Sequence, residues 1–131
     1  MKDQYLDLDA TAMAELVASQ KVKPVELVDE AISRIESSNP KVNAVVWRDF
    51  EGARERARRD LPEGLFTGVP FLIKDLALQK GATCTFGSSF FRNFEPQISS
   101  AAVERMLGSG LISLGRTNSP EFGLVPTTEP V

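Results

Sequence analysis

The most constraining feature of this sequence is a short apolar run that ends in a lysine. The run covers residues 69–73, and Lys74 follows it directly. It is too short for a helix, and it is apolar on both alternating faces, which is the pattern of a strand covered on both sides. Pro70 cannot donate a ladder hydrogen bond, so the strand is expected to begin there. The chain therefore has to fold around at least one fully buried strand.

A helix and a second buried strand are predicted further along the chain. Residues 101–107 are expected to form the helix, with Ser99 or Ser100 as its cap and a glycine after its end. Residues 111–114 have the pattern of another buried strand. Strand, helix and strand in this order form the parallel crossover unit, which is expected to be right-handed. The predicted fold class is therefore α/β.

The N-terminal part, residues 1–61, is predicted to be helical. Asp9 or Thr11 can cap a first helix that ends near residue 19. Pro24 suits the first turn of a second helix, and Asn39-Pro40 is expected to stop it. A short apolar run at 43–47 precedes a third helix over 50–61. Because apolar helix stripes are stable only when buried, these helices should cover an α/β core at 65–131, and residues 1–131 form a single unit.

The chain contains no histidine and a single cysteine, Cys84. Imidazole is the commonest proton shuttle near neutral pH, so Ser-His-Asp and Cys-His nucleophile arrangements cannot be built from these residues, nor can histidine-ligated zinc. One cysteine also excludes an internal disulfide and a cysteine-cluster metal site. Cys84 is expected to be a small buried side chain, since the sequence offers no identifiable basic partner for a reactive thiol.

Charge and hydropathy narrow the class of protein further. The net charge of −3 and the pI near 5.0 give no basic surface of the kind that binds nucleic acid. The arginines of segment 54–59 alternate with acidic residues and are expected on a solvated helix face. Residues 1–10 lack a secretory pattern, and no stretch approaches the length of a membrane span. We therefore expect a cytoplasmic protein with no nucleic-acid or membrane partner.

Lys74 is expected at the carboxyl end of the first strand, where ligands collect in α/β sheets. Two interpretations are open. Either the side chain is solvated where the strand meets a loop, or it is desolvated by Phe71, Ile73 and Leu76, so that its neutral amine can act as a base. Asp75 should point to the opposite face from Lys74 and is expected to take a capping or turn role.

Several segments of the chain follow one another in the order and spacing of a known family. The five blocks are residues 68–76, 87–88, 102–107, 114–122 and 128–130. Residues 25–27, 34–35 and 39–44 look like the N-terminal helices of the same family. In these segments the sequence resembles the amidase signature family, and the resemblance covers nearly all of the chain. It implies the N-terminal part of that family's mixed sheet covered by helices.

The resemblance also implies a chemistry for Lys74. Members of the family hydrolyse carboxylic amides with a serine nucleophile, a second serine in a cis peptide bond and a lysine, which matches Lys74. Neutral Lys74 would accept a proton through the bridging serine, and the nucleophile would form an acyl-enzyme without metal or organic cofactor. The glycine-rich segment that carries both serines is expected after Val131. Lys74 is then the only catalytic residue in the chain, and the isolated chain is predicted to be inactive.

The resemblance singles out two further places in the chain. Segment 122–125 matches the family loop near the acyl-binding site, so Gly123 and Leu124 are expected near bound substrate, with Gly123 letting the backbone approach it. An ordinary buried loop is the alternative. Ser88 and Ser89 look superficially like the serine segment, but two phenylalanines follow them instead of glycines. Both serines are expected to be loop residues.

Three hypotheses for function are distinguished by sequence. Leu76 after Lys74-Asp75, together with segment 127–130, favours the broad bacterial amidases that include the 6-aminohexanoate cyclic dimer hydrolases, with a small-molecule amide as substrate. The glutamyl-tRNA amidotransferase A subunit, which more usually has asparagine after the Lys-Asp pair, is the enzymatic alternative. The third hypothesis is a non-catalytic binding or scaffold fragment that adds its sheet edge to another protein. An open sheet edge also predicts self-association.

Overall fold

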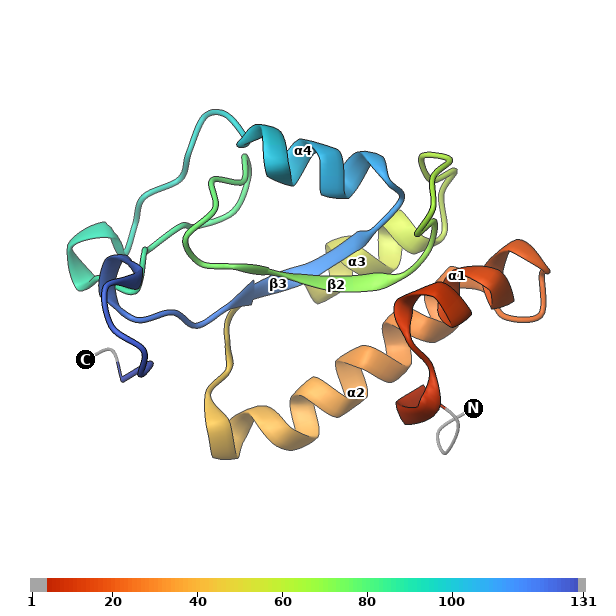
Figure 1. Cartoon of the computed structure of the whole chain (residues 1–131), viewed down its shortest axis with the longest axis horizontal. Helices are drawn as coiled ribbons and strands as arrows, with labels where there is room; N and C mark the ends of the chain where they lie inside the picture. The colour runs from red at the N-terminus through yellow and green to blue at the C-terminus, as the bar shows by residue number, and fades with distance from the viewer. Residues whose placement is uncertain (1–4, 130–131) are drawn as a thin grey trace.

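The protein has an α/β architecture in the computed structural model, which describes residues 5–129 (Figure 1). Its centre is a three-stranded sheet with the strand order β1-β3-β2. Strand β2 (Pro70–Lys74) runs parallel to β3 (Ile112–Thr117), and β1 (Val45–Arg48) runs antiparallel to β3 on its other side. The predicted fold class, a mixed sheet with helices, is confirmed.

Helices lie on both sides of the sheet. In Figure 1, α2 (Pro24–Val42) lies on one side of β2 and β3, and α4 (Ala101–Gly108) lies on the other. Helix α3 (Phe50–Ala57) packs with α2 against β3. Buried apolar side chains form one cluster between α2, α3 and β3. They are Val28, Ala31, Ile32, Ala53, Ala57, Ile112 and Leu114. None of the helices within residues 5–129 is long and apolar enough to cross a membrane.

Helix α1 (Ala10–Ala18) begins and ends close to the predicted positions. The Asp9 carboxylate accepts a hydrogen bond from the Ala12 N–H at 2.8 Å, which makes Asp9 the cap. A second cluster of buried side chains, Met13, Leu27 and Val69, joins α1 and α2 to the residue before β2. The N-terminal helices therefore cover the sheet, as their apolar stripes require.

The predicted strand, helix and second strand are present as β2, α4 and β3. Strand β3 is almost fully buried, but β2 is an outer strand in which only Ile73 is buried, so the prediction that the first strand is covered on both sides is wrong for the described residues. The Ser100 hydroxyl caps α4 by accepting from the Val103 N–H at 3.4 Å. Strand β3 continues beyond its predicted end at residue 114 because it stays paired with β2 as far as Lys74 and Thr117. This parallel pairing brings the carboxyl ends of both strands to one edge of the sheet.

The sequence prediction placed two helix ends wrongly. Helix α2 passes through Pro40 and ends only at Val42. Its last turn is held from outside, because the buried Asn39 side chain accepts from the Val45 N–H at 2.7 Å and donates to the Val45 carbonyl at 2.9 Å. Helix α3 ends at Ala57 instead of residue 61. Pro62 disfavours helical geometry in Leu61, which keeps that residue out of the helix but does not explain the end at Ala57.

Strand β1 begins inside the apolar run at 43–47 and continues to Arg48, and a glycine lets it approach β3 closely. Gly115 of β3 has φ +152°, and a Cβ at this position would collide with the Trp47 carbonyl of β1. Any larger residue would separate the two strands. Gly115 thus allows β1 to pair closely with β3, and this antiparallel pair makes the sheet mixed.

Candidate active site

The carboxyl ends of β2 and β3 meet at one edge of the sheet, as parallel pairing dictates. Lys74 is the last residue of β2 and pairs with Thr117, the last residue of β3. The Asp75 N–H donates to the Thr117 carbonyl at 3.0 Å, so the ladder extends past the end of β2. The predicted position of Lys74 at this edge is therefore confirmed.

The side chain of Lys74 is exposed. Ile73 is buried, but neighbouring residues of a strand point to opposite faces, so Ile73 does not cover the Lys74 amine. Phe71 and Leu76 are only partly buried. Of the two interpretations of Lys74, the solvated one is confirmed for residues 5–129, and these apolar residues do not desolvate its side chain there. Desolvation of the amine would require groups outside this part of the chain.

Asp75 lies in the turn after β2, as predicted, and its carboxylate also forms a buried ion pair with Arg116 that the sequence did not predict. Asp75 is 1% exposed and Arg116 is 0% exposed. Arg116 Nε donates to Asp75 Oδ1 at 2.9 Å. The Thr85 N–H donates to the same carboxylate oxygen at 3.0 Å, and the Thr85 hydroxyl donates to Asp75 Oδ2. These bonds compensate the cost of removing both charges from water.

The rest of the Arg116 guanidinium holds the backbone that follows Lys74. Arg116 Nη2 donates to the Lys74 carbonyl at 3.3 Å and to the Ala77 carbonyl at 2.5 Å. Arg116 Nη1 donates to Gln79 Oε1 at 3.3 Å. Because the donors of a guanidinium lie in one rigid plane, a single side chain of β3 fixes the end of β2 and the loop after it. This contact was not predicted from the sequence, where its one signal is an arginine close behind the buried run at 111–114.

Cys84 is fully buried, as predicted, but it has a basic neighbour. Arg116 Nη2 lies 3.2 Å from Cys84 Sγ, which corrects the expectation that no basic partner is near. Burial raises the pKa of the Cys84 thiol, and the charge of Arg116 opposes this effect without reversing it. The thiol is therefore held in its protonated, less reactive form.

We expect Cys84 to resist modification by DTNB at neutral pH as long as the chain is folded. Both burial and the raised pKa of the thiol reduce the amount of accessible thiolate. The measurement compares labelling rates in buffer and in urea, where one thiol per chain should react quickly. Labelling at the same rate in both solutions would contradict the burial of Cys84.

A cavity lies at the carboxyl edge of the sheet, next to the residues that follow β2 and β3. This cavity of about 520 Å³ is lined by Asp75 and Asn118, which directly follow Lys74 and Thr117 in the sequence. Its other lining residues are Asn43, Val46, Trp47, Thr83, Thr85, Gly87, Ser88, Ser89 and Arg92. Hydroxyl and amide groups dominate this list, and such groups can orient a polar ligand.

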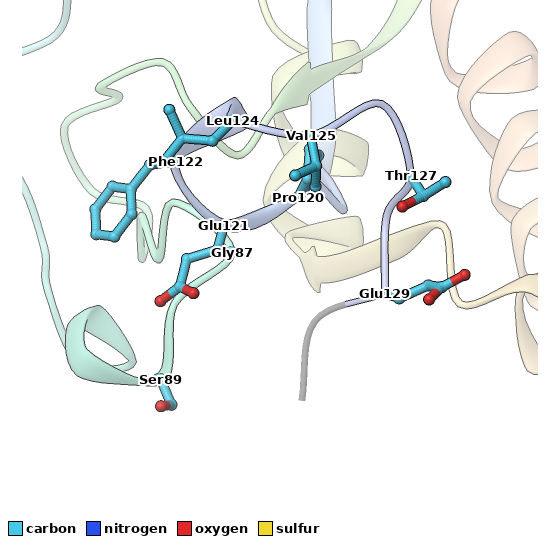
Figure 2. A pocket seen from close by; sticks show the side chains of 9 residues that line it. All are labelled: Gly87, Ser89, Pro120, Glu121, Phe122, Leu124, Val125, Thr127 and Glu129. Carbon is cyan, nitrogen blue, oxygen red and sulfur yellow. The ribbon is translucent and has the colours of Figure 1, made fainter.

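Another cavity, of about 580 Å³, lies beside the loop that follows β3 (Figure 2). Leu124 lines it with Gly87, Ser89, Pro120, Glu121, Phe122, Val125, Thr127 and Glu129, and Lys74 is not a lining residue. Gly123 has φ +68°, and a Cβ there would lie 2.9 Å from Leu76 Cδ1. The structure thus brings Gly123 against the segment after Lys74. Both Gly123 and Leu124 are exposed, so the alternative of a buried loop is wrong.

Ser88 lies in a loop, as predicted, whereas Ser89 belongs to a short 3-10 helix. Ser88 is 6% exposed, and its hydroxyl donates to Glu121 Oε1 at 2.7 Å. Ser89 is exposed and begins the short 3-10 helix η2 (Ser89–Phe91). The hydrogen bond of Ser88 to Glu121 connects this loop to the loop after β3.

Within residues 5–129, no three His, Cys, Asp or Glu side chains are grouped closely enough to hold a metal ion.

Fold and site together define an α/β protein with an exposed lysine at the carboxyl edge of its parallel strands, where the loops that follow the strands line two cavities. The Amidase family model matches residues 26–131. The chain therefore belongs to the amidase signature family.

Two relatives and one solved structure show how much of a family member the chain represents. It is 38% identical over 125 residues to the 6-aminohexanoate-cyclic-dimer hydrolase of Paenarthrobacter ureafaciens, covering 93% of this chain and 25% of that protein. It is 30% identical over 130 residues to the glutamyl-tRNA(Gln) amidotransferase A subunit of Oenococcus oeni, covering 95% of this chain and 27% of that protein. A structure of 6-aminohexanoate cyclic dimer hydrolase complexed with substrate is similar with a TM-score of 0.86 and 37% identity, covering 94% of this chain and 26% of that one. The chain thus spans about a quarter of the length of the relatives it matches.

Proposed function

We propose that this chain is the lysine-bearing part of a hydrolase that acts on carboxylic amides. The observation that carries the proposal is the place of Lys74, an exposed lysine at the carboxyl edge of β2 in an amidase fold. We assign the two serines of the reaction to a part of the protein that follows residue 131. The isolated chain is then inactive, because it holds the proton acceptor without the nucleophile.

In the proposed reaction, the amine of Lys74 begins uncharged and takes up one proton. The bridging serine relays that proton from the nucleophilic serine, whose oxygen bonds to the amide carbonyl carbon. When the carbon–nitrogen bond breaks, the proton moves back along the relay to the departing amine. Water then hydrolyses the acyl-enzyme and releases the acid. Because a solvated lysine is normally charged, we propose that the serine-bearing part also covers Lys74 and excludes water.

Gly123 and Leu124 are proposed to contact the acyl part of the substrate. Two observations support this assignment: Gly123 lies against Leu76, two residues after Lys74, and Leu124 is 80% exposed beside a cavity. The proposed substrate is a small carboxylic amide, the class to which a cyclic dimer of 6-aminohexanoate belongs. The 30% identity to an amidotransferase polypeptide of this family supports amide-nitrogen transfer as a second candidate function, which would require partner subunits.

A chimera tests the proposed function. In it, this chain replaces the matching N-terminal quarter of the P. ureafaciens hydrolase, whose remaining part follows residue 131. We expect the chimera to hydrolyse the cyclic dimer or a simple aryl amide, whereas the isolated chain does not. A soluble, folded chimera without hydrolysis, beside an active parent hydrolase, would overturn the proposal.

We also expect the isolated chain to self-associate. Strands β1 and β2 are the outer strands of the sheet, and several large apolar side chains are exposed, with Phe90 at 85% and Leu124 at 80%. Open edges and apolar surface favour association between copies. Size-exclusion chromatography with light scattering should show a mass that rises with concentration. A concentration-independent monomer that binds no hydrophobic dye would argue against this expectation.

A further inference from the structure

We propose that Arg116 is a positioning residue for Lys74. Its guanidinium fixes the backbone of residues 74–77 and thereby sets the place from which the Lys74 amine reaches the reacting groups. The inference rests on the proposed function, because the position of Lys74 matters to catalysis only if Lys74 moves the proton.

Arg116 and Lys74 lie on opposite faces of the sheet. Arg116 pairs with Ile73 and Thr117 pairs with Lys74 in the parallel ladder, and side chains of consecutive residues alternate between faces. Arg116 therefore holds the backbone of Lys74 from the buried face and leaves its side chain free on the exposed one. The ladder bond from the Asp75 N–H to the Thr117 carbonyl, 3.0 Å long, fixes the same backbone from the side.

The hydrogen-bond acceptors around Arg116 fit a planar guanidinium. The side chain is 0% exposed and bonds at once to a carboxylate, two backbone carbonyls and the Gln79 amide oxygen. The carboxylate partner, Asp75, is itself held by Thr85. A lysine at position 116 could keep the charge opposite Asp75, but its single ammonium lacks the fork that spans the other acceptors. The predicted role therefore depends on the shape of the side chain as well as its charge.

Small displacements of Lys74 should have large effects on the rate. Proton transfer requires donor and acceptor atoms within about 2.6–3.2 Å of each other. A misplacement of about 1 Å can cost on the order of 100-fold in rate. Without Arg116, the loop after Lys74 keeps its local turn, with the Leu76 and Ala77 N–H groups donating to the Lys74 carbonyl at 2.7 and 3.1 Å. This local turn makes no bond to β3, so without Arg116 the bond from the Asp75 N–H to the Thr117 carbonyl remains as the link between this segment and β3.

The test uses the chimera and two variants that keep position 116 packed. Arg116→Lys retains the charge, and Arg116→Met with Asp75→Leu removes both buried charges together, which avoids an unpaired ion. In each variant that is folded by circular dichroism, we expect kcat to fall about 10- to 100-fold while KM stays within about twofold. A purely structural role would lower the melting temperature and leave kcat unchanged at low temperature.

Arg56→Met is the matched control. Arg56 also donates to a carboxylate, Asp49 at 2.8 Å, and to a backbone carbonyl of β3, Ser113 at 2.7 Å, but near the opposite end of the strand. Its kcat should equal that of the chimera. The inference is overturned if kcat of a folded Arg116 variant stays within about twofold of the chimera while Lys74→Ala abolishes activity. If Lys74→Ala also retains activity, the proposed function itself has failed.

Discussion

Replacing Lys74 with alanine in the chimera is expected to lower kcat for amide hydrolysis by about 100- to 10,000-fold, the contribution of one positioned acid–base group. The side chain is exposed at the carboxyl edge of β2, so its removal should leave the buried core intact. Steady-state kinetics with an aryl amide measure the effect. Circular dichroism should show the same spectrum and melting temperature as the chimera.

Two further variants make the Lys74 result specific. Lys74→Arg keeps a positive charge, but a guanidinium does not give up its proton in proteins, so this variant should be as inactive as Lys74→Ala. Lys80→Ala removes an exposed lysine from the following loop and should leave kcat unchanged. Near-normal hydrolysis by Lys74→Ala would show that the role given to Lys74 is wrong.

Replacing Arg116 alone with methionine should destabilise the chain by about 3–5 kcal/mol. The variant leaves the Asp75 carboxylate buried at 1% exposure without its cation, and it removes donors from the Lys74 and Ala77 carbonyls. Urea unfolding at low protein concentration measures the free energy. Trp47, the only tryptophan, lies in β1 beside β3 and should report the transition by fluorescence.

The double variant Arg116→Met with Asp75→Leu provides the control for this stability effect. It replaces both ions with apolar side chains, and such replacements of a whole buried pair are often neutral or stabilising. We therefore expect most of the lost stability to return. If the single and double variants unfold at the same urea concentration, an unpaired buried carboxylate is not the cause of the loss.

The fold was predictable where the signal is local. The apolar run at 69–73 and the capped helix after Ser100 are patterns of neighbouring residues, and both are present in the structure. Helix α2 passes through Pro40 because Asn39 bonds to Val45 outside the helix, a contact that helix propensity does not contain. Strand β1 likewise depends on pairing with β3, a segment far along the chain.

In the candidate site, too, local features were predictable from the sequence and long-range contacts were not. The position of Lys74 follows from the strand that it ends, and the structure confirms it. The ion pair of Asp75 and Arg116 joins residues 41 positions apart, so no local pattern announces it. The sequence left two interpretations of the Lys74 side chain open, solvated or desolvated. The structure shows it exposed, with the buried Ile73 on the opposite face of the strand.

Sequencing the gene downstream of the Val131 codon is the sharpest test of the role proposed for Lys74. Catalysis by Lys74 requires two serines supplied by a later segment of the same protein. We predict that the reading frame continues into a glycine-rich segment that contains both serines. A stop codon directly after Val131 would refute the proposed role, because Lys74 would then lack the nucleophile and the bridging serine that amide hydrolysis requires.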